Sequence, residues 1–338
     1  MLKSMWKSSF FLLLLFQVNL YGSVWNDYKN RFITFDGRIV DYQNNSISHS
    51  EGQGYGMILA LMYNDKRTFD LIWRWTKDNI QVRKDKLFAW KWGKRYNNWT
   101  VIDYNNATDG DILISYALLK AYEKWNQEKY KKEALDVLKD IKEHLSVSFG
   151  GHKFLLPGYY GFFSKDYTVL NPSYYVFPAF DLFSKYSNGK FWQQIYEGGL
   201  WLLSNARFGL LGLPADWVVL KNNGVFIFKK RSIYFGYEAI RIPLYLCVKG
   251  EKRFFGTESI LDCYERFGYI PLWIDLVHDS ISIKDAPASY YAIYAKVARI
   301  LGKKKLSEKL QKRARERLSY IKDNYYFLTL YLLAQKWK

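Results

Sequence analysis

The sequence predicts a mostly α-helical protein, and three observations lead to this fold class. Apolar residues recur at helical spacing along most of the 338 residues. Only seven prolines are present, and they are scattered, so few positions interrupt a helix. Short segments rich in Gly, Asn and Asp separate the periodic stretches, which is typical of the loops that join helices.

The periodic stretches follow one another in pairs. The expected helices cover residues 51–62, 65–80, 109–124, 129–145, 174–186, 190–204, 237–247, 289–301, 305–321 and 324–335. In the second of them, Phe69, Ile72 and Trp73 share one face. Thr108 is placed to cap the third. Residues 225–230 are expected to form a short strand in a hairpin.

A ring of helical hairpins would satisfy this pattern, with inner helices buried on all sides and amphipathic outer helices. Periodicity alone gives only a mostly α fold, and the closed ring does not follow from it. No Pro/Gly/Ser linker, low-complexity stretch or lasting shift in composition divides the chain. We therefore expect a single domain over residues 24–338.

The N-terminal segment has the composition of a secretory signal. Two lysines precede an apolar run at residues 10–16, and small residues follow it. We expect residues 1–23 to be a signal peptide. An uncleaved anchor is the alternative, because Leu20 and Tyr21 fit a cleavage site poorly. We expect an exported protein, periplasmic or secreted, with no stable membrane span in the mature chain.

The formal net charge of +18 is high, with local density at residues 129–132, 229–231 and 303–317. A nucleic-acid-binding protein would have such a charge. However, Leu306 and Leu310 interrupt the last run at helical spacing, so its basic side chains fall on a solvent face. We expect a solvated basic surface and no nucleic-acid partner, with adhesion to an acidic envelope surface as the alternative.

Cysteine and histidine usage argues against a metal centre. Cys247 and Cys263 are the only cysteines, and the leucine-rich surroundings of Cys247 favour a buried free thiol over a disulfide. The four histidines stand apart, without the spacing of a metal site. We expect neither a metal nor any other cofactor.

Three acidic motifs are the candidates for chemistry. Glu51 stands at a helix start beside glycines, which allow close approach of a substrate. The alternative is a structural role, in which its negative charge only stabilises the positive end of the helix dipole. Asp109 and Asp111 begin another helix, and one of them is expected to cap it. Glu238 and Arg241 are three residues apart, so the arginine can hold the glutamate ionised. An ordinary surface ion pair is the alternative.

Flat aromatic side chains accompany these acids. Trp90, Trp99, Tyr174 and Tyr55 are candidates for stacking on sugar rings, although any of them could belong to the core. Hydrolysis of a sugar chain needs carboxyl groups that donate and accept protons, among rings that bind the apolar faces of the sugars. The pattern therefore favours a glycoside hydrolase.

The motifs resemble those of glycoside hydrolase family 8. Residues 107–111 and the helix after them fit the family pattern A-[ST]-D-[AG]-D-x-x-[IM]-A-x-[SA], except that Ser115 stands where alanine is usual. Other similar segments are residues 50–57, 88–94, 171–174, 212–217 and 236–243. The resemblance is greatest to the secreted endo-β-1,4-glucanases encoded with bacterial cellulose synthases, and it covers residues 25–247.

The resemblance implies an (α/α)6 barrel with a few short strands in its loops, and inversion at the anomeric carbon. It places Glu51 as general acid and Asp109 as a catalytic aspartate that orients sugar or water. Glu238 falls where the family has an aspartate base. This departure leaves three alternatives: the site has adjusted to the longer glutamate, Asp109 is the base, or activity is weak. Arg241 would fix the base, and Asp111 would bind sugar hydroxyls or cap its helix.

The resemblance also implies a β-1,4-glucan chain as substrate, and possible association with cellulose synthase machinery. Xylan and mixed-linkage glucan are alternatives within the family, whereas a polycationic chitosan suits so basic a chain poorly. An accessory glucan-binding protein with weak or lost turnover is the alternative outside the enzyme class. We expect a monomer.

Overall fold

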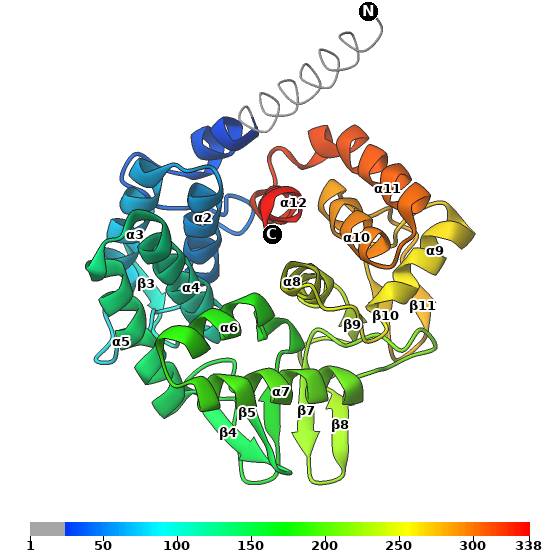
Figure 1. Cartoon of the computed structure of the whole chain (residues 1–338), viewed down its shortest axis with the longest axis horizontal. Coiled ribbons are helices and arrows are strands. Elements are labelled where there is room, and N and C mark those ends of the chain that lie inside the picture. Colours follow the sequence, from blue (N-terminus) through cyan, green and yellow to red (C-terminus); the bar gives the residue numbers. More distant parts are fainter. Residues whose placement is uncertain (1–23) are drawn as a thin grey trace, which may run out of the picture.

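A computed structural model describes residues 24–338 as a ring of helices (Figure 1). The predicted signal peptide lies outside these residues. Within them, the inner wall consists of α2 (Ser50–Met62), α4 (Thr108–Trp125), α6 (Phe177–Tyr186), α8 (Arg241–Lys249), α10 (Ala288–Ile300) and α12 (Tyr325–Lys336). Each inner helix contacts the next, and α12 contacts α2 again. The expected barrel of helical hairpins is therefore confirmed.

The outer helices each pack against an inner one. They are α3 (Lys66–Ile80), α5 (Glu128–His144), α7 (Gly189–Asn205), α9 (Ile260–Phe267) and α11 (Lys304–Glu316). In α3, the predicted face of Phe69, Ile72 and Trp73 is buried. Residues 24–32 are also helical and lie against α12, where the Tyr28 and Thr329 hydroxyls are 3.0 Å apart.

Inner and outer helices differ in burial, as a closed barrel requires. Every residue of α2 from Gly52 to Leu61 is buried, whereas α5 buries one stripe that includes Tyr130, Val137 and Ile141. The inner helices therefore need apolar or hydrogen-bonded side chains on all sides. A polar residue on an inner helix is either paired or functional.

The two ends of the barrel are built differently. Short turns such as 63–65, 126–127 and 187–188 follow the inner helices, and we name that end the turn end. Long connections precede the inner helices and form the loop end. The loop end carries the 3-10 helices η1 (Pro172–Tyr174) and η3 (Leu318–Ile321), while η2 (Thr257–Ser259) follows α8.

The strands described in the structure are short and antiparallel, and they lie in the long connections. One sheet has the order β1-β2-β3, another β6-β7-β8 and a third β11-β10-β9, and β4 pairs with β5. Their bounds are β1 Ser48–His49, β2 Lys91–Arg95, β3 Asn98–Asp103, β4 Ser146–Phe149, β5 His152–Leu155, β6 Thr168–Leu170, β7 Val218–Lys221, β8 Gly224–Ile227, β9 Tyr234–Phe235, β10 Ile274–Asp275 and β11 Ser280–Ile281. The predicted hairpin is β7-β8.

Several predicted boundaries are wrong for identifiable reasons. Thr108 does not cap α4 but is its first residue, and its hydroxyl donates to the carbonyl of Leu156 at 2.5 Å. Residues 172–174 form η1, so α6 begins only at Phe177. The segment before Arg241 is a turn, so Glu238 precedes α8 instead of belonging to it. Helix α9 was not predicted.

The cysteine expectation is confirmed. Cys247 and Cys263 are both free thiols, and burial raises the pKa of Cys247 to about 12. Such a thiol is protonated at neutral pH and behaves as a small apolar side chain. In the described part of the chain, we find no helix with the length and apolarity that crossing a membrane requires.

Candidate active site

Three predicted acids meet at one arginine at the loop end. Glu51 comes from the start of α2, Asp109 from the start of α4, and Glu238 from the turn before α8. Nη1 of Arg241 contacts Oε1 of Glu51 and lies 2.8 Å from Oδ2 of Asp109. Nη2 of Arg241 contacts Oε2 of Glu238. Side chains far apart in sequence thus share one guanidinium.

The charges of this cluster act on one another strongly because water is largely excluded. Burial lowers the pKa of the Arg241 guanidinium, but the negative charges of Glu51 and Glu238 outweigh this effect, so the pKa lies above its ordinary value. Burial, together with the charge of Glu51, raises the pKa of Asp109 to about 7, and Arg241 opposes this rise. Burial therefore disfavours the ionised form of Asp109.

A glycine allows the two helix starts to meet. A Cβ atom on Gly110 would lie 2.2 Å from Oγ of Ser50 and 2.8 Å from N of Glu51. No side chain fits at that separation, so α4 can approach α2 this closely only with glycine here. The close approach brings Asp109 beside Glu51.

A histidine that the sequence argument left without a role orients the start of α2. His49 is the N-cap residue, and its Nδ1 accepts from the backbone N–H of Gly52 at 3.1 Å. Its Nε2 faces Oδ2 of Asp41 at 3.8 Å. The backbone N–H of Ser50 donates to the carbonyl of Trp90 at 3.1 Å. Glu51 thus stands on a helix start fixed from two sides.

The turn that carries Glu238 is held by a buried aspartate. Oδ1 of Asp216 accepts from the backbone N–H groups of Gly236 and Ala239 at 3.0 and 2.9 Å, and Oδ2 accepts from Ser232. Burial raises the pKa of Asp216 to about 6 despite these hydrogen bonds. Asp216 is a positioning residue, because it shapes the turn without contacting the cluster.

Two further side chains from η1 and the residue before it complete the surroundings of Glu238. Nδ2 of Asn171 donates to Oε2 of Glu238 at 3.2 Å, and Oδ1 of Asn171 accepts from the hydroxyl of Ser173 at 2.7 Å. That hydroxyl in turn lies 2.7 Å from Nη2 of Arg241. The sequence placed Asn171, Ser173 and Asp216 in family-like segments, but their types gave no hint of these roles.

A cavity of about 610 Å³ opens beside the cluster. It is lined by Asp41, Gln43, Asn44, Glu51, Tyr237, Glu238, Arg241, Asn324, Tyr326 and Phe327. The side chain of Glu238 is 35% exposed and that of Glu51 is 18% exposed, whereas Asp109 is 2% exposed. A molecule in the cavity therefore meets Glu51 and Glu238 before it meets Asp109.

Three of the predicted aromatic side chains keep an accessible surface. Trp99 is 48% exposed and stacks on Trp92 with ring centroids 5.3 Å apart. Tyr174 lies within the cluster, where the guanidinium of Arg241 is 5.5 Å from its ring. Trp90 is half-buried beside Lys91. Stacking of these rings on sugars stays a prediction.

The predicted substrate contact of Tyr55 is wrong. Tyr55 is fully buried, and its hydroxyl lies 2.5 Å from that of Tyr245 in α8. Neither face of its ring is open to a sugar. Because α2 is an inner helix, most of its side chains point into the core. The sequence motif alone does not give the direction of the Tyr55 side chain.

Asp111 binds the loops around α4 instead of capping that helix. It is fully buried, its Oδ1 accepts from the backbone N–H of Phe88 at 2.9 Å, and its Oδ2 accepts from Asn106 at 2.6 Å. Burial raises the pKa of Asp111 to about 7. Both carboxylate oxygens are therefore engaged with the loops around α4, and the prediction that they bind sugar hydroxyls is wrong.

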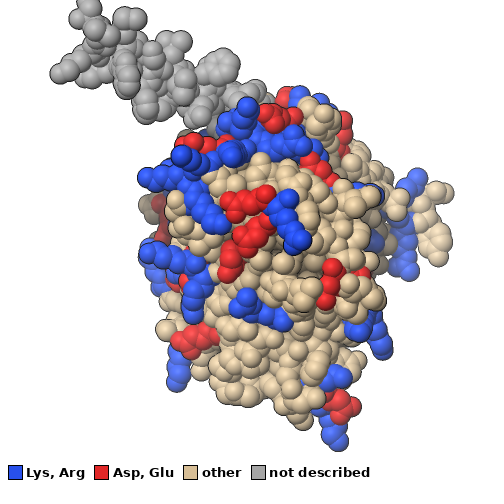
Figure 2. Space-filling view, turned by 90° about the vertical axis from the view of Figure 1, so that its right-hand side faces the viewer, with Lys and Arg blue, Asp and Glu red and all other residues tan. Residues whose placement is uncertain are grey.

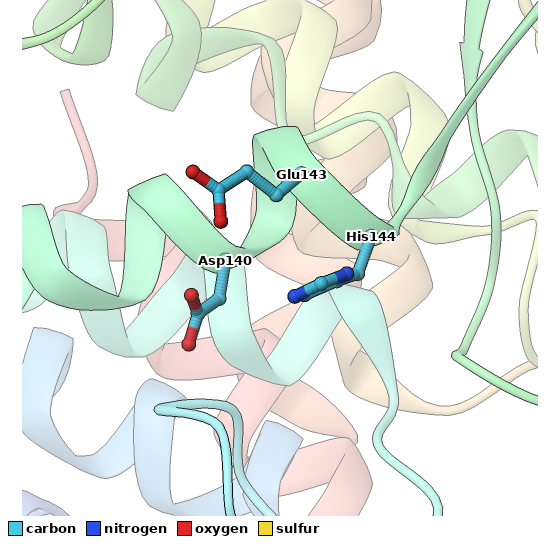
Figure 3. A group of neighbouring side chains, drawn as sticks. All are labelled: Asp140, Glu143 and His144. Atoms are coloured by element: carbon cyan, nitrogen blue, oxygen red, sulfur yellow. The ribbon is translucent and has the colours of Figure 1, made fainter.

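A separate group of possible ligands lies on an outer helix. Asp140, Glu143 and His144 project from the last turns of α5 (Figure 3), and one ligand atom of each lies within 4.8 Å of the others. Oδ2 of Asp140 accepts from the backbone N–H of Lys86 at 2.6 Å. Glu143 and His144 are exposed. Nothing further marks a cation site here, and we assign it no function.

The chain is similar to known glucanases. An endoglucanase of Cellulomonas uda is 38% identical over 228 residues, which are 66% of this chain and 62% of that protein. A probable endoglucanase of Novacetimonas hansenii is 35% identical over 281 residues, 80% of each chain. The structure of an endo-β-1,4-glucanase from Acetobacter xylinum matches with a TM-score of 0.83 and 31% identity, covering 93% of this chain and 96% of that one.

The family assignment rests on nearly the whole chain. Residues 3–338 match the sequence model of glycosyl hydrolases family 8. The ring of inner helices and the acids gathered at Arg241 agree with that match. The chain therefore belongs to glycosyl hydrolases family 8.

Proposed function

We propose that this protein is an endo-β-1,4-glucanase that hydrolyses cellulose-type glucan with inversion. One observation carries the proposal: Glu51 and Glu238 line the same cavity and contact different nitrogens of one buried guanidinium. Two carboxyl groups that are held apart can act on opposite faces of a sugar ring. The similar proteins named above are endoglucanases, which supports β-1,4-glucan as the substrate.

The reaction is a single displacement. Glu51 gives its proton to the glycosidic oxygen while the bond from the anomeric carbon to that oxygen breaks. Water forms the new bond to the same carbon from the opposite face, and Glu238 takes the proton that the water loses. Room for this water requires carboxyl groups about 6.5–9.5 Å apart. The product is a new reducing end of inverted configuration and a shortened chain.

We assign the base to Glu238 because it is the more accessible of the two candidates. Asp109 is almost fully buried behind Arg241, and both its oxygens are engaged, one by Arg241 and one by the backbone N–H of Gly110 at 2.8 Å. Glu238 has an exposed part that reaches the cavity. Asp109 and Arg241 then orient the two reacting carboxyl groups.

The test is the viscosity of carboxymethylcellulose. The wild-type protein should lower it rapidly, because internal cleavage shortens long chains. Glu51→Gln should reduce the rate by a factor of about a hundred or more, since the amide has no proton to give. Glu128→Gln, an exposed change at the start of α5, is the matched control and should keep full activity. Equal rates for wild type and Glu51→Gln would show that Glu51 is not the acid.

We further propose that the protein is exported and works beside the machinery that makes cellulose. The lysines and apolar run of residues 1–23 support export, and the resemblance to glucanases encoded with cellulose synthases supports the partner. Mass spectrometry of the protein isolated from culture fluid or periplasm should show a chain that begins near residue 24. Recovery of the intact chain in the cytoplasm alone would contradict export.

A further inference from the structure

The positive charge of the protein is concentrated at the turn end. The stretches there are residues 63–67, 120–132, 185–190, 249–253, 299–305 and 336–338. Together they hold 18 lysines and arginines against four acidic residues. Five further acids outside these stretches pair with Lys66, Lys132, Lys249 and Lys303, so a surplus of nine positive charges, half of the net charge of +18, lies at this end. On the side of the molecule that carries α9 and α11, Lys and Arg side chains gather in the upper part and also project along both edges, while the middle of the lower part is mostly uncharged (Figure 2).

The turn end also has an apolar cavity among its lysines. It measures about 380 Å³ and lies between the C-terminal parts of α2, α4 and α12. Its apolar lining residues include Ile58, Leu61, Met62 and Trp337. Its charged lining residues are Lys120, Lys124, Lys336, Lys338 and Glu123. Because α2, α4 and α12 begin at the catalytic cavity, this second cavity lies at the opposite end of the barrel.

The chain enters the described region at this same end. The ring of Trp25 stacks on that of Tyr63, the C-cap residue that follows α2, with centroids 5.2 Å apart. Nε1 of Trp25 donates to Oδ2 of Asp65 at 3.2 Å. The N-terminal helix of the described chain therefore packs against the turn end.

We propose that the turn end is a docking surface for a bilayer that contains anionic phospholipid. Fifteen of the 18 basic residues are lysines, which meet phosphate groups as compact point charges. The apolar cavity between them suits the glycerol and acyl part of a lipid and gives a nucleic acid nothing to bind. Docked in this way, the protein holds its catalytic cavity away from the membrane, toward the glucan.

The test uses the full chain and sedimentation with two kinds of vesicle. One contains equal parts of phosphatidylglycerol and phosphatidylcholine, and the other contains phosphatidylcholine alone. The triple variant Lys129→Gln, Lys252→Gln and Lys304→Gln removes exposed charges from three turns at this end. Each lysine near such a surface contributes about fivefold to binding, so the variant should bind the anionic vesicles about a hundredfold more weakly.

The matched control removes three exposed lysines from the loop end: Lys165→Gln, Lys221→Gln and Lys284→Gln. This variant should bind the anionic vesicles as the wild type does, and both variants should keep full activity on carboxymethylcellulose. Equal binding of the wild type to the two kinds of vesicle would overturn the proposal. So would an equal loss in the control, or retention on DNA without vesicle binding.

Discussion

Arg241 organises the catalytic centre at the scale of single residues. It is 2% exposed and contacts the side chains of Glu51, Asp109, Glu238 and Ser173. Its planar guanidinium fixes the directions of its partners in a way that a lysine ammonium would not. Without it, three carboxyl groups would meet in a largely water-free place without a counter-charge, which is strongly unfavourable.

The length of Glu238 can be tested directly. In Glu238→Asp the carboxylate would withdraw by one methylene from the cavity, from Nδ2 of Asn171 and from Arg241. Displacements of about 1 Å at a reacting group can lower a rate about a hundredfold. We expect a fall of that order in kcat on cello-oligosaccharides, with little change in KM.

The opposite outcome has a definite meaning. A large gain in kcat for Glu238→Asp would show that glutamate is a defect at this position. The protein would then act mainly as a glucan-binding accessory with weak turnover. Asp181→Glu, a change of the same size at an exposed position on α6, is the control for non-specific effects of side-chain length.

Glu51, Asp109 and Glu238 were named from motifs that carry charge, and the structure brings all three to Arg241. Their catalytic roles stay predictions. Tyr55 and Asp111 could not be placed, because the direction of a side chain on an inner helix depends on the whole ring. Asp111 looks like Asp109 in the sequence, but only Asp109 faces Arg241.

At the scale of elements, helix starts do most of the positioning. α2 begins at a histidine cap, α4 approaches it through Gly110, and α8 begins at Arg241 itself. Each reacting side chain therefore lies within a few residues of a helix start, where the backbone is well fixed. The positive end of a helix dipole also stabilises carboxylates placed there.

The turn that carries Glu238 should depend on Asp216. Asp216→Ala leaves the buried N–H groups of Gly236 and Ala239 without their acceptor, at a cost of about 1–3 kcal/mol each. We expect lower stability in urea and a lower kcat. Asp216→Asn keeps an acceptor oxygen at this position and should retain most of both.

The wild type and Asp216→Asn should differ in how pH affects their stability. Asp216 has a pKa of about 6 when folded, against an ordinary value of 3.8. The folded state keeps this proton where the unfolded state loses it, so stability falls as pH rises from 3.8 to about 6. Urea midpoints measured across this pH range should therefore fall less steeply with pH for Asp216→Asn than for the wild type. An unchanged slope would show that Asp216 does not titrate in this way.

Elements were predicted well where the pattern is local. The inner and outer helices of the first half were predicted within a few residues, because 3.6-residue periodicity is visible in the sequence. The short strands are different: β1 pairs with β2 across more than 40 residues, and β9 pairs with β10 across a similar gap. Two- to six-residue strands with distant partners leave no periodic signal.

At the scale of the whole molecule, the decisive feature is ring closure between α2 and α12. These helices lie more than 260 residues apart in sequence, so no local pattern specifies their contact. Closure brings residues from Asp41 to Phe327 around one cavity. Only the resemblance to a family predicted this closed ring. The all-α pattern alone would also fit an open array of hairpins.

In the proposed reaction, Glu51 and Glu238 act from opposite sides of one β-linked bond. Proton NMR of the first products from a cello-oligosaccharide tests it most directly, before the new reducing ends equilibrate in solution. A single displacement at a β-linked bond should release these ends first as the α anomer. Appearance of the β anomer first would contradict a single displacement and the roles given to both glutamates.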